Sequence, residues 1–203
     1  MRVTSRDCRG FFLPLMRQTL PLVLCVMLAA SVVACRTTPA DATADYELTD
    51  LTGAYVAFFD LTQNFAADAR VVAFKVEVGA RFPGFYDAAR MAEFAGMTPA
   101  QYDAEIVQSF TNFPQRREAF TRTAASFQSM LRPAIDSFVG TFGNFRNAGR
   151  IALLHSLGET DGGTRTLNGQ NWLVFGADVM ARLYPPGRER PFFHHELFSM
   201  SRP

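Results

Sequence analysis

The sequence predicts an α+β protein, with a mainly helical N-terminal part followed by a small sheet and a C-terminal helix. Apolar and aromatic residues recur at helical spacing over most of residues 48–142. From residue 151 onward, short apolar runs alternate with glycine-containing turns. A last apolar segment, which begins at Pro191, is expected to be helical.

Residues 1–34 are interpreted as a signal peptide that is removed from the mature protein. The apolar run at residues 20–33 is shorter than the roughly 20 residues that a transmembrane helix needs. The preceding basic segment contains Arg2, Arg6, Arg9 and Arg17. The run ends in Val32-Val33-Ala34-Cys35, which resembles a bacterial lipobox. This resemblance implies cleavage before Cys35, lipidation of Cys35 and a membrane anchor; the alternative is an ordinary secretory signal with a chance cysteine.

The residues around the cleavage site also suggest where the protein resides. In lipoproteins of enteric-like bacteria an aspartate after the lipidated cysteine favours the inner membrane, so Arg36 indicates the outer membrane, with the protein facing the periplasm. The other two cysteines, Cys8 and Cys25, lie in the removed segment, so no disulfide is expected.

The mature chain is expected to contain a flexible tether at residues 35–46 and one globular domain at residues 47–203, incomplete at its C-terminus. Residues 36–46 are small and polar, which is typical of a tether. The domain holds 18 of the 20 phenylalanines of the chain, which favours a packed core. Cleavage removes more basic than acidic residues and leaves no basic stripe, so nucleic acid is not an expected partner.

The helical part is expected to contain several helices. Residues 48–61 show helical periodicity, and residues 65–78 fit a helix slightly better than a strand, although residues 74–78 alternate. Pro83-Gly84 is a break, and residues 86–94 form a short helix that ends near Gly96. These apolar stripes are interpreted as core packing.

A capping box predicts the start of the next helix. Thr98 is the cap, Pro99 is the first helical residue and Gln101 completes the box. Pro114 is expected to start a further helix, and Pro133 to kink or end it, before helical periodicity continues to Gly143.

The C-terminal part is expected to contain three strands and two helices. Residues 151–154 are predicted as a buried strand, residues 161–163 as a turn and residues 164–167 as a strand. The Asn168-Gly169 dipeptide predicts a hairpin turn to a strand at residues 170–175. A helix at 177–183, a loop at 185–187 and the terminal helix follow. No internal repeat, phosphate-binding glycine loop or nucleophile elbow is found.

The terminal helix carries an incomplete zinc-protease signature, His-Glu-x-x-His. In that signature two histidines at i and i+4 bind zinc on one helix face, and the glutamate is the general base. Here His195 and Glu196 match the first two positions, but Ser199 stands where the second histidine belongs. The i+4 neighbour of His194 is Phe198, which cannot bind zinc either.

Residues 150–198 resemble the metal-proximal half of a zincin-type metallopeptidase, specifically the predicted zinc-dependent proteases found as bacterial lipoproteins. The resemblance implies that His195 is a metal ligand, that Glu196 is the catalytic base, and that residues 172–175 are the edge strand of the substrate cleft. Zinc binding is expected to be weak or absent, because Ser199 replaces a ligand and no third ligand can follow before Pro203.

Three functions are therefore considered. The first is a membrane-anchored lipoprotein that resembles a zinc metallopeptidase but lacks peptidase activity. The second is a helical envelope lipoprotein that binds or scaffolds a protein or peptide partner. The third is an active zinc protease with a truncated sequence record. In the second case His194 and His195 are partly buried, Glu196 is solvated or paired with Arg190, and His155 is structural.

Overall fold

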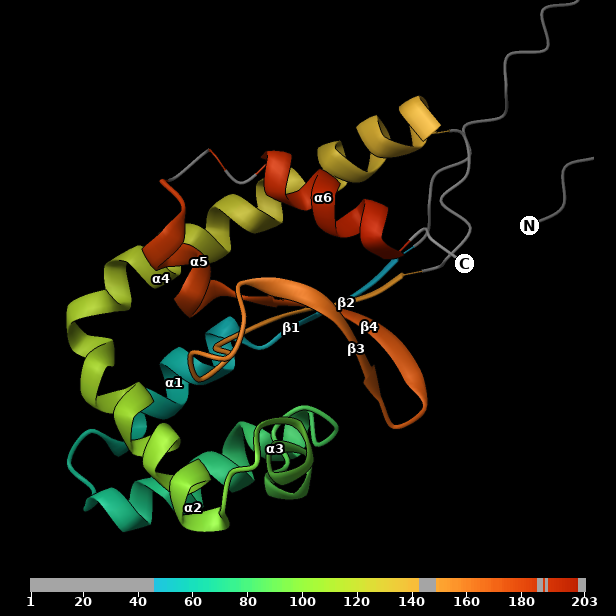
Figure 1. Cartoon of the computed structure of the whole chain (residues 1–203). Helices are drawn as coiled ribbons and strands as arrows, with labels where there is room; N and C mark the ends of the chain where they lie inside the picture. Colours follow the sequence, from blue (N-terminus) through green and yellow to red (C-terminus); the bar gives the residue numbers. More distant parts are fainter. Residues whose placement is uncertain (1–45, 143–148, 186–187, 189, 201–203) are drawn as a thin grey trace, which may run out of the picture. The chain divides into compact units, whose positions relative to one another are not determined.

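A computed structural model describes residues 46–142, 149–185, 188 and 190–200 of the chain (Figure 1). The predicted signal peptide, Cys35 and the predicted tether up to residue 45 lie outside these residues. The described part is α+β, as predicted, and combines several helices with one four-stranded sheet. None of the described helices is long and apolar enough to cross a membrane.

The sheet contains three parallel strands and one antiparallel strand. Its strands are β1 (Tyr46–Asp50), β2 (Gly149–Leu154), β3 (Gly162–Leu167) and β4 (Gln170–Gly176), in the order β1-β2-β4-β3. β1, β2 and β4 are parallel, whereas β3 pairs with β4 in the antiparallel direction. The central strand β2 is almost entirely buried, and β4 is buried from Leu173 to Gly176, which explains their continuous apolar runs.

The β3–β4 hairpin confirms one turn prediction and corrects another. Asn168 and Gly169 both have positive φ angles, of 51° and 74°, as a two-residue hairpin turn requires. The turn predicted at residues 161–163 is wrong at its end, because β3 already begins at Gly162. A Cβ atom at Gly162 would lie 2.5 Å from the Phe192 ring, so this glycine is needed for strand–helix packing.

The N-terminal part begins with a strand that the sequence did not reveal. Tyr46, expected in the tether, belongs to β1, and Leu48, expected in a helix, pairs with Ile151. Asp50 ends this strand: its carboxylate accepts hydrogen bonds from the Thr52 backbone N–H (2.8 Å) and hydroxyl (2.7 Å). The first helix, α1 (Thr52–Thr62), therefore starts four residues later than predicted.

Three short segments connect α1 to the long helix of the protein. They are α2 (Ala67–Glu77), the 3-10 turn η1 (Gly79–Arg81) and α3 (Ala88–Ala95). The helical interpretation of residues 65–78 is thus confirmed over the strand alternative. α3 ends at Gly96, whose φ of 67° is left-handed, as predicted for a glycine after a helix.

α4 (Pro99–Phe142) is a single helix of 44 residues. The predicted capping box is present: the Thr98 N–H donates to Gln101 Oε1 (2.8 Å), and the Gln101 N–H donates to Thr98 Oγ1 (3.3 Å). The prediction that Pro114 starts a new helix is wrong, and the helix does not end at Pro133. α4 bends along its length (Figure 1), which accommodates the prolines, while buried side chains hold it together across them.

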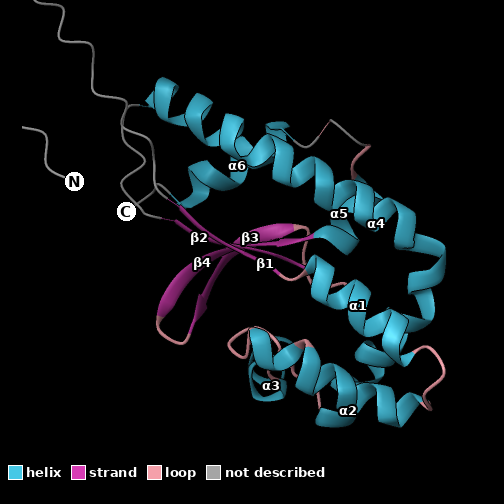
Figure 2. Ribbon diagram, turned by 180° about the vertical axis from the view of Figure 1, so that it is seen from behind, coloured by secondary structure: helices cyan, strands magenta, loops and turns pink. Residues whose placement is uncertain are grey.

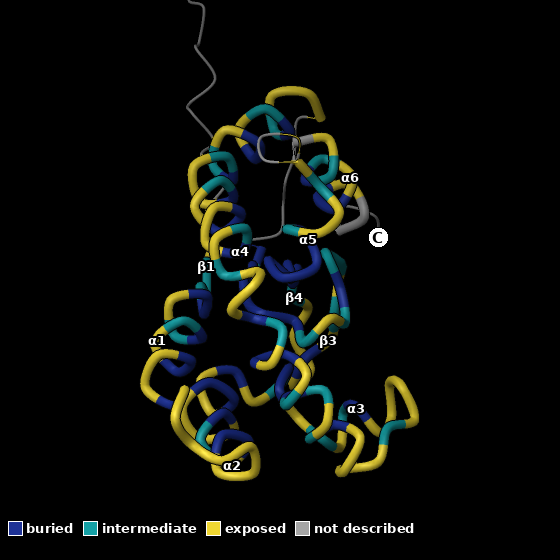
Figure 3. Tube along the Cα trace, turned by 90° about the vertical axis from the view of Figure 1, so that its left-hand side faces the viewer, coloured by how far each residue is buried: buried dark blue, intermediate teal, exposed yellow. Residues whose placement is uncertain are grey.

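Two helices complete the chain and lie against α4. They are α5 (Ala177–Leu183), as predicted, and α6 (Arg190–Met200). Figure 2 shows α5, α6 and the C-terminal part of α4 on one side of the sheet, and α1 to α3 together with the N-terminal part of α4 on the other. The dark-blue trace of β4 in Figure 3 lies in the buried centre between these groups.

Candidate functional site

The candidate site lies where the parallel strands β2 and β4 end. Leu154, the last residue of β2, is paired with Gly176, the last residue of β4. His155 directly follows β2, and Asp178 lies in the first turn of α5, directly after β4. The parallel pairing therefore brings two polar side chains together at the carboxyl edge of the sheet, where open α/β sheets place their ligand sites.

Asp178 fixes the loop that follows β2. Its Oδ1 atom accepts hydrogen bonds from the Ser156 backbone N–H (2.6 Å) and hydroxyl (3.0 Å), and its Oδ2 atom accepts one from the Gly158 N–H (2.8 Å). The side chain is only 8% exposed. Between these anchors Leu157 has a positive φ of 58°, which is uncommon for this residue type and occurs mostly at constrained sites.

His155 is held in a defined orientation beside Asp178. Its Nδ1 atom accepts a hydrogen bond from the Leu157 N–H (3.2 Å) and lies 3.5 Å from Asp178 Oδ2, which is too long for a good hydrogen bond. Its ring stacks on Tyr55 with centroids 4.1 Å apart, and its carbonyl oxygen accepts a hydrogen bond from the Tyr86 hydroxyl (2.7 Å).

This geometry favours the neutral imidazole with its proton on Nε2. Nδ1 already acts as an acceptor, so the ring proton belongs on the other nitrogen. Burial lowers the pKa of His155, although the nearby Asp178 carboxylate opposes this effect. At neutral pH His155 therefore offers an N–H donor, and no described residue accepts a hydrogen bond from it.

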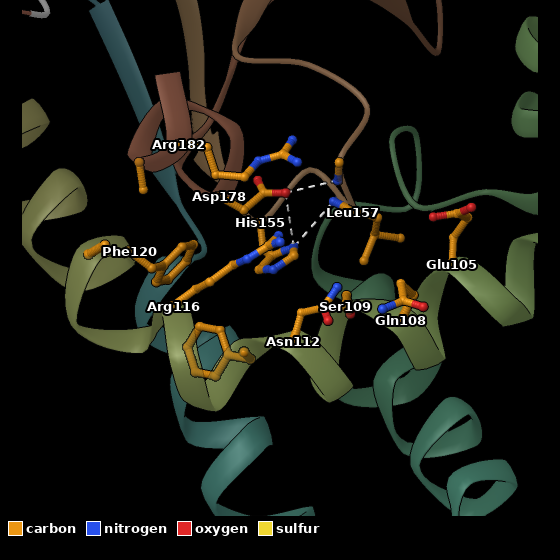
Figure 4. A pocket seen from close by; sticks show the side chains of 14 residues that line it. Glu105, Gln108, Ser109, Asn112, Arg116, Phe120, His155, Leu157, Asp178 and Arg182 are labelled. Atoms are coloured by element: carbon orange, nitrogen blue, oxygen red, sulfur yellow. Dashed lines mark hydrogen bonds and ion pairs between the residues drawn. The ribbon is translucent and has the colours of Figure 1, made fainter. Parts of the chain in front are cut away.

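A cavity of about 310 Å³ opens beside His155 (Figure 4). Its walls come from α4, from the loop after β2 and from α5. The polar and charged side chains among them are Glu105, Gln108, Ser109, Asn112, Arg116, His155, Asp178 and Arg182. Ser109 is already engaged, because it accepts a hydrogen bond from the Tyr55 hydroxyl (2.9 Å) and donates to the Ile106 carbonyl (2.7 Å).

Two arginines give one end of this cavity a positive character. Arg116 extends from α4 toward the imidazole of His155, and Arg182 reaches the same region from α5 (Figure 4). Both cations lie close enough to act on the pKa of His155. Neither guanidinium forms an ion pair with a described residue, unlike Arg117, which pairs with Asp60. The site thus holds two exposed arginines, without ion pairs in the part of the chain that the structure describes, near an N–H donor.

The two carboxylates of the cavity do not neutralise these arginines. Asp178 lies beside His155 (Figure 4), but it accepts its three hydrogen bonds from the loop after β2 and forms no ion pair with either arginine. Glu105 lies on α4 beyond Leu157, away from the two guanidinium groups (Figure 4). The cavity therefore has both arginines and the Asp178 carboxylate near His155, and a second carboxylate, Glu105, at its opposite end.

A second cavity of about 280 Å³ adjoins the first. Most of its lining is apolar or aromatic: Phe85, Met91, Phe94, Ala95, Met97 and Tyr102. Glu105, Leu157 and Gly158 line both cavities. A Cβ atom added to Gly158 would meet no atom within 4 Å, so open space adjoins the backbone at the residue that both cavities share.

The residues of the incomplete zinc signature lie elsewhere, on α6. His195 is exposed, whereas Glu196 is 8% exposed, and burial raises the pKa of its carboxyl group. His194 is half-buried and its Nε2 atom is buried without a hydrogen-bond partner among the described residues. The expectation of partial burial is therefore confirmed for His194 and wrong for His195. The side chains of Arg190 and Ser199 lie outside the described part.

The strand predicted to line a protease cleft is not at an edge of the sheet. β4, which contains residues 172–175, is paired on both sides, with β2 and with β3. The expectation of an edge strand there is wrong, because the chain returns through the hairpin and places β3 outside β4. Among the described residues, no group of three or more His, Cys, Asp or Glu side chains is placed to hold a metal ion.

His155, which was expected to be structural, has a further role in the fold. The residue is indeed buried, at 6% exposure, but it also lines the cavity. The available signal was a histidine and an aspartate that each follow an apolar strand by one or two residues.

Comparison of the chain with protein-family models, with curated proteins and with solved structures finds no match.

Proposed function

We propose that this protein is a membrane-anchored lipoprotein of the bacterial envelope that binds a small ligand through an anionic group in the cavity beside His155. One observation carries the binding proposal: two guanidinium groups without ion pairs, from Arg116 and Arg182, flank a neutral histidine in a cavity of about 310 Å³. This proposal develops the second function considered above, a binding module.

The chemistry of the lining supports an anionic group. Guanidinium groups match carboxylates and phosphates in shape and can donate two parallel hydrogen bonds to either. The Nε2–H of His155 supplies a further donor that needs no proton uptake at neutral pH. The volume of the cavity lies at the lower end of the range typical of small-molecule sites, roughly 300–1,000 Å³.

The membrane anchor is proposed from the lipobox-like residues 32–35 and the preceding apolar run. Acylation of Cys35 would hold the domain at the membrane through more than one chain, since a single acyl chain gives only marginal binding. Arg36 supports the outer membrane, with the domain in the periplasm.

The resemblance to zincins is proposed as ancestry, with α6 as a remnant of the active-site helix and without peptidase activity. Ser199 cannot replace a histidine ligand, and zinc catalysis needs three protein ligands and an open position. The burial that raises the pKa of Glu196 also disfavours the carboxylate form that a general base needs. Zinc-dependent cleavage of casein by the purified mature chain would contradict this proposal.

Thermal unfolding in the presence of acetate or inorganic phosphate tests the binding proposal. Both anions should raise the melting temperature of the wild type, because a ligand that binds only the folded state stabilises it. The double variant Arg116→Gln/Arg182→Gln should lose this concentration-dependent shift. Arg122→Gln is the matched control, since Arg122 lies on α4 but outside the cavity and pairs with Glu118. Equal shifts in the wild type and the double variant would refute the site.

A further inference from the structure

Glu105 lies where the two cavities meet and has no partner there. Its side chain is half-buried and lines both cavities, yet it forms no ion pair or hydrogen bond with a described residue. A carboxylate in this position is a site for an ammonium group. The ligand would then carry a positive group as well as the anionic group that meets the arginines.

The position of Glu105 on α4 sets the spacing between these two groups. Arg116 follows Glu105 by 11 residues, which is close to three helical turns, so both residues lie on one face of the helix. Their Cα atoms are thus separated by about 16 Å along α4, before the side chains reach inward. An α-amino acid, whose charges share one carbon atom, is too short to meet both groups.

The second cavity supplies a place for an apolar group beside the positive one. Its aromatic and methionine side chains, together with the ion pair of Arg90 and Glu159, line about 280 Å³ next to Glu105. A ligand side chain attached near the ammonium group could enter this second cavity past Gly158, which has no side chain to block the way. Glu105, the apolar cavity beside it and the two distant arginines would together suit a molecule with an ammonium group, a neighbouring apolar side chain and a distant carboxylate.

We infer that the ligand is a short peptide of two or three residues with free termini and an apolar first residue. Its carboxylate would bind Arg116 and Arg182, its ammonium group would bind Glu105, and its first side chain would fill the second cavity. An extended peptide spans about 3.3–3.6 Å per residue, so two or three residues place the terminal charges farther apart than the two charges of a single amino acid. This inference rests on the proposed function, because it uses the same cationic end of the site.

Calorimetric titration with the tripeptide Phe-Ala-Ala and two blocked forms tests the charge pattern. Glu105→Gln should weaken binding of the free peptide about tenfold and leave binding of N-acetyl-Phe-Ala-Ala unchanged. Arg116→Gln should weaken binding of the free peptide similarly, but not that of the C-terminal amide. Glu118→Gln, an exposed site on α4 outside both cavities, is the control and should bind like the wild type.

The apolar cavity is tested with Gly-Ala-Ala and with Ala95→Trp, which adds bulk at an exposed lining residue. Phe-Ala-Ala should bind the wild type at least tenfold more tightly than Gly-Ala-Ala, and Ala95→Trp should remove this preference. Equal binding of the free and acetylated peptides, or no preference for Phe, would overturn the peptide inference. If acetate and phosphate still bind through the arginines, the proposed function survives that result; if they do not, both are wrong.

Discussion

His155 shows how the fold converts an ordinary residue into a candidate binding group. It lies 23 residues before Asp178 in the sequence, and the parallel pairing of β2 and β4 brings the two together. The loop after β2 is fixed by three hydrogen bonds to the Asp178 carboxylate. Within this loop, the Leu157 N–H donates a hydrogen bond to Nδ1 of His155. A sequence shows neither the strand pairing nor the tautomer, so the cavity could not be predicted from it.

The burial of His155 leads to an expected pH dependence of stability. The folded protein binds this proton less readily than the unfolded chain, whose histidine titrates near 6.5. Because the unfolded state binds more protons below that pH, acidification should lower the free energy of unfolding. His155→Gln should lose less stability than the wild type between pH 7.5 and 5.5, by at most about 1.4 kcal/mol per pH unit.

Urea unfolding at several pH values measures this difference. The groups that face His155 are Asp178 and Arg182 from α5, Arg116 from α4 and Tyr55 from α1, and the substitution leaves all of them in place. Glu196 has a raised pKa and so contributes with the opposite sign, but equally in both proteins. Parallel pH profiles for the two proteins would show that His155 is not held neutral by the fold.

Tyr102 provides a second expectation at the scale of one residue. Its hydroxyl is buried without a hydrogen-bond partner among the described residues. Tyr102→Phe removes this unsatisfied group, so the free energy of unfolding should rise by about 1 kcal/mol. Tyr86→Phe is the contrasting control, because it breaks the hydrogen bond to the His155 carbonyl and should lower stability by about 1 kcal/mol or more. A loss of stability in Tyr102→Phe would contradict this description of its surroundings.

At the scale of elements, local signals in the sequence predicted the structure well. The Thr98–Gln101 capping box, the Asn168-Gly169 turn and the bounds of α5 are set by neighbouring residues, and each is present. The predictions that were wrong concern features that depend on contacts between residues far apart in the sequence. β1 exists because it pairs with a strand about a hundred residues away, and α4 continues past Pro114 because its side chains are buried on both sides of the proline.

Phe193 and Leu197 are the buried apolar residues through which α6 packs on the rest of the protein. The Phe193 ring is fully buried and lies at 81° to the rings of Phe127, 4.8 Å away, and Phe175, 5.5 Å away. Phe193→Ala should lower the free energy of unfolding by about 3–5 kcal/mol. The more exposed Phe198 is the matched control on the same helix, and Phe198→Ala should cost about 1 kcal/mol or less. Similar losses for the two variants, measured by urea unfolding, would contradict the packing described for α6.

At the scale of the whole molecule, the proposed anchor and the cavity lie in separate parts of the chain. The anchor depends on Cys35, whereas the residues that line the cavity begin at Glu105. Cys35→Ser should therefore release the protein from the membrane fraction and abolish lipid labelling, while the melting-temperature shift with phosphate stays unchanged. Continued labelling of the variant with radioactive acyl chains would show that the lipobox interpretation is wrong.

The central claim is that the cavity beside His155 binds an anionic group, and NMR of the imidazole nitrogens tests it most directly. The chain has only three histidines, so His194 and His195 on α6 serve as internal references. At neutral pH, phosphate should shift the Nε2 signal of His155, and Arg116→Gln/Arg182→Gln should abolish the shift. An unchanged His155 signal at saturating phosphate, or a response confined to α6, would contradict the claim.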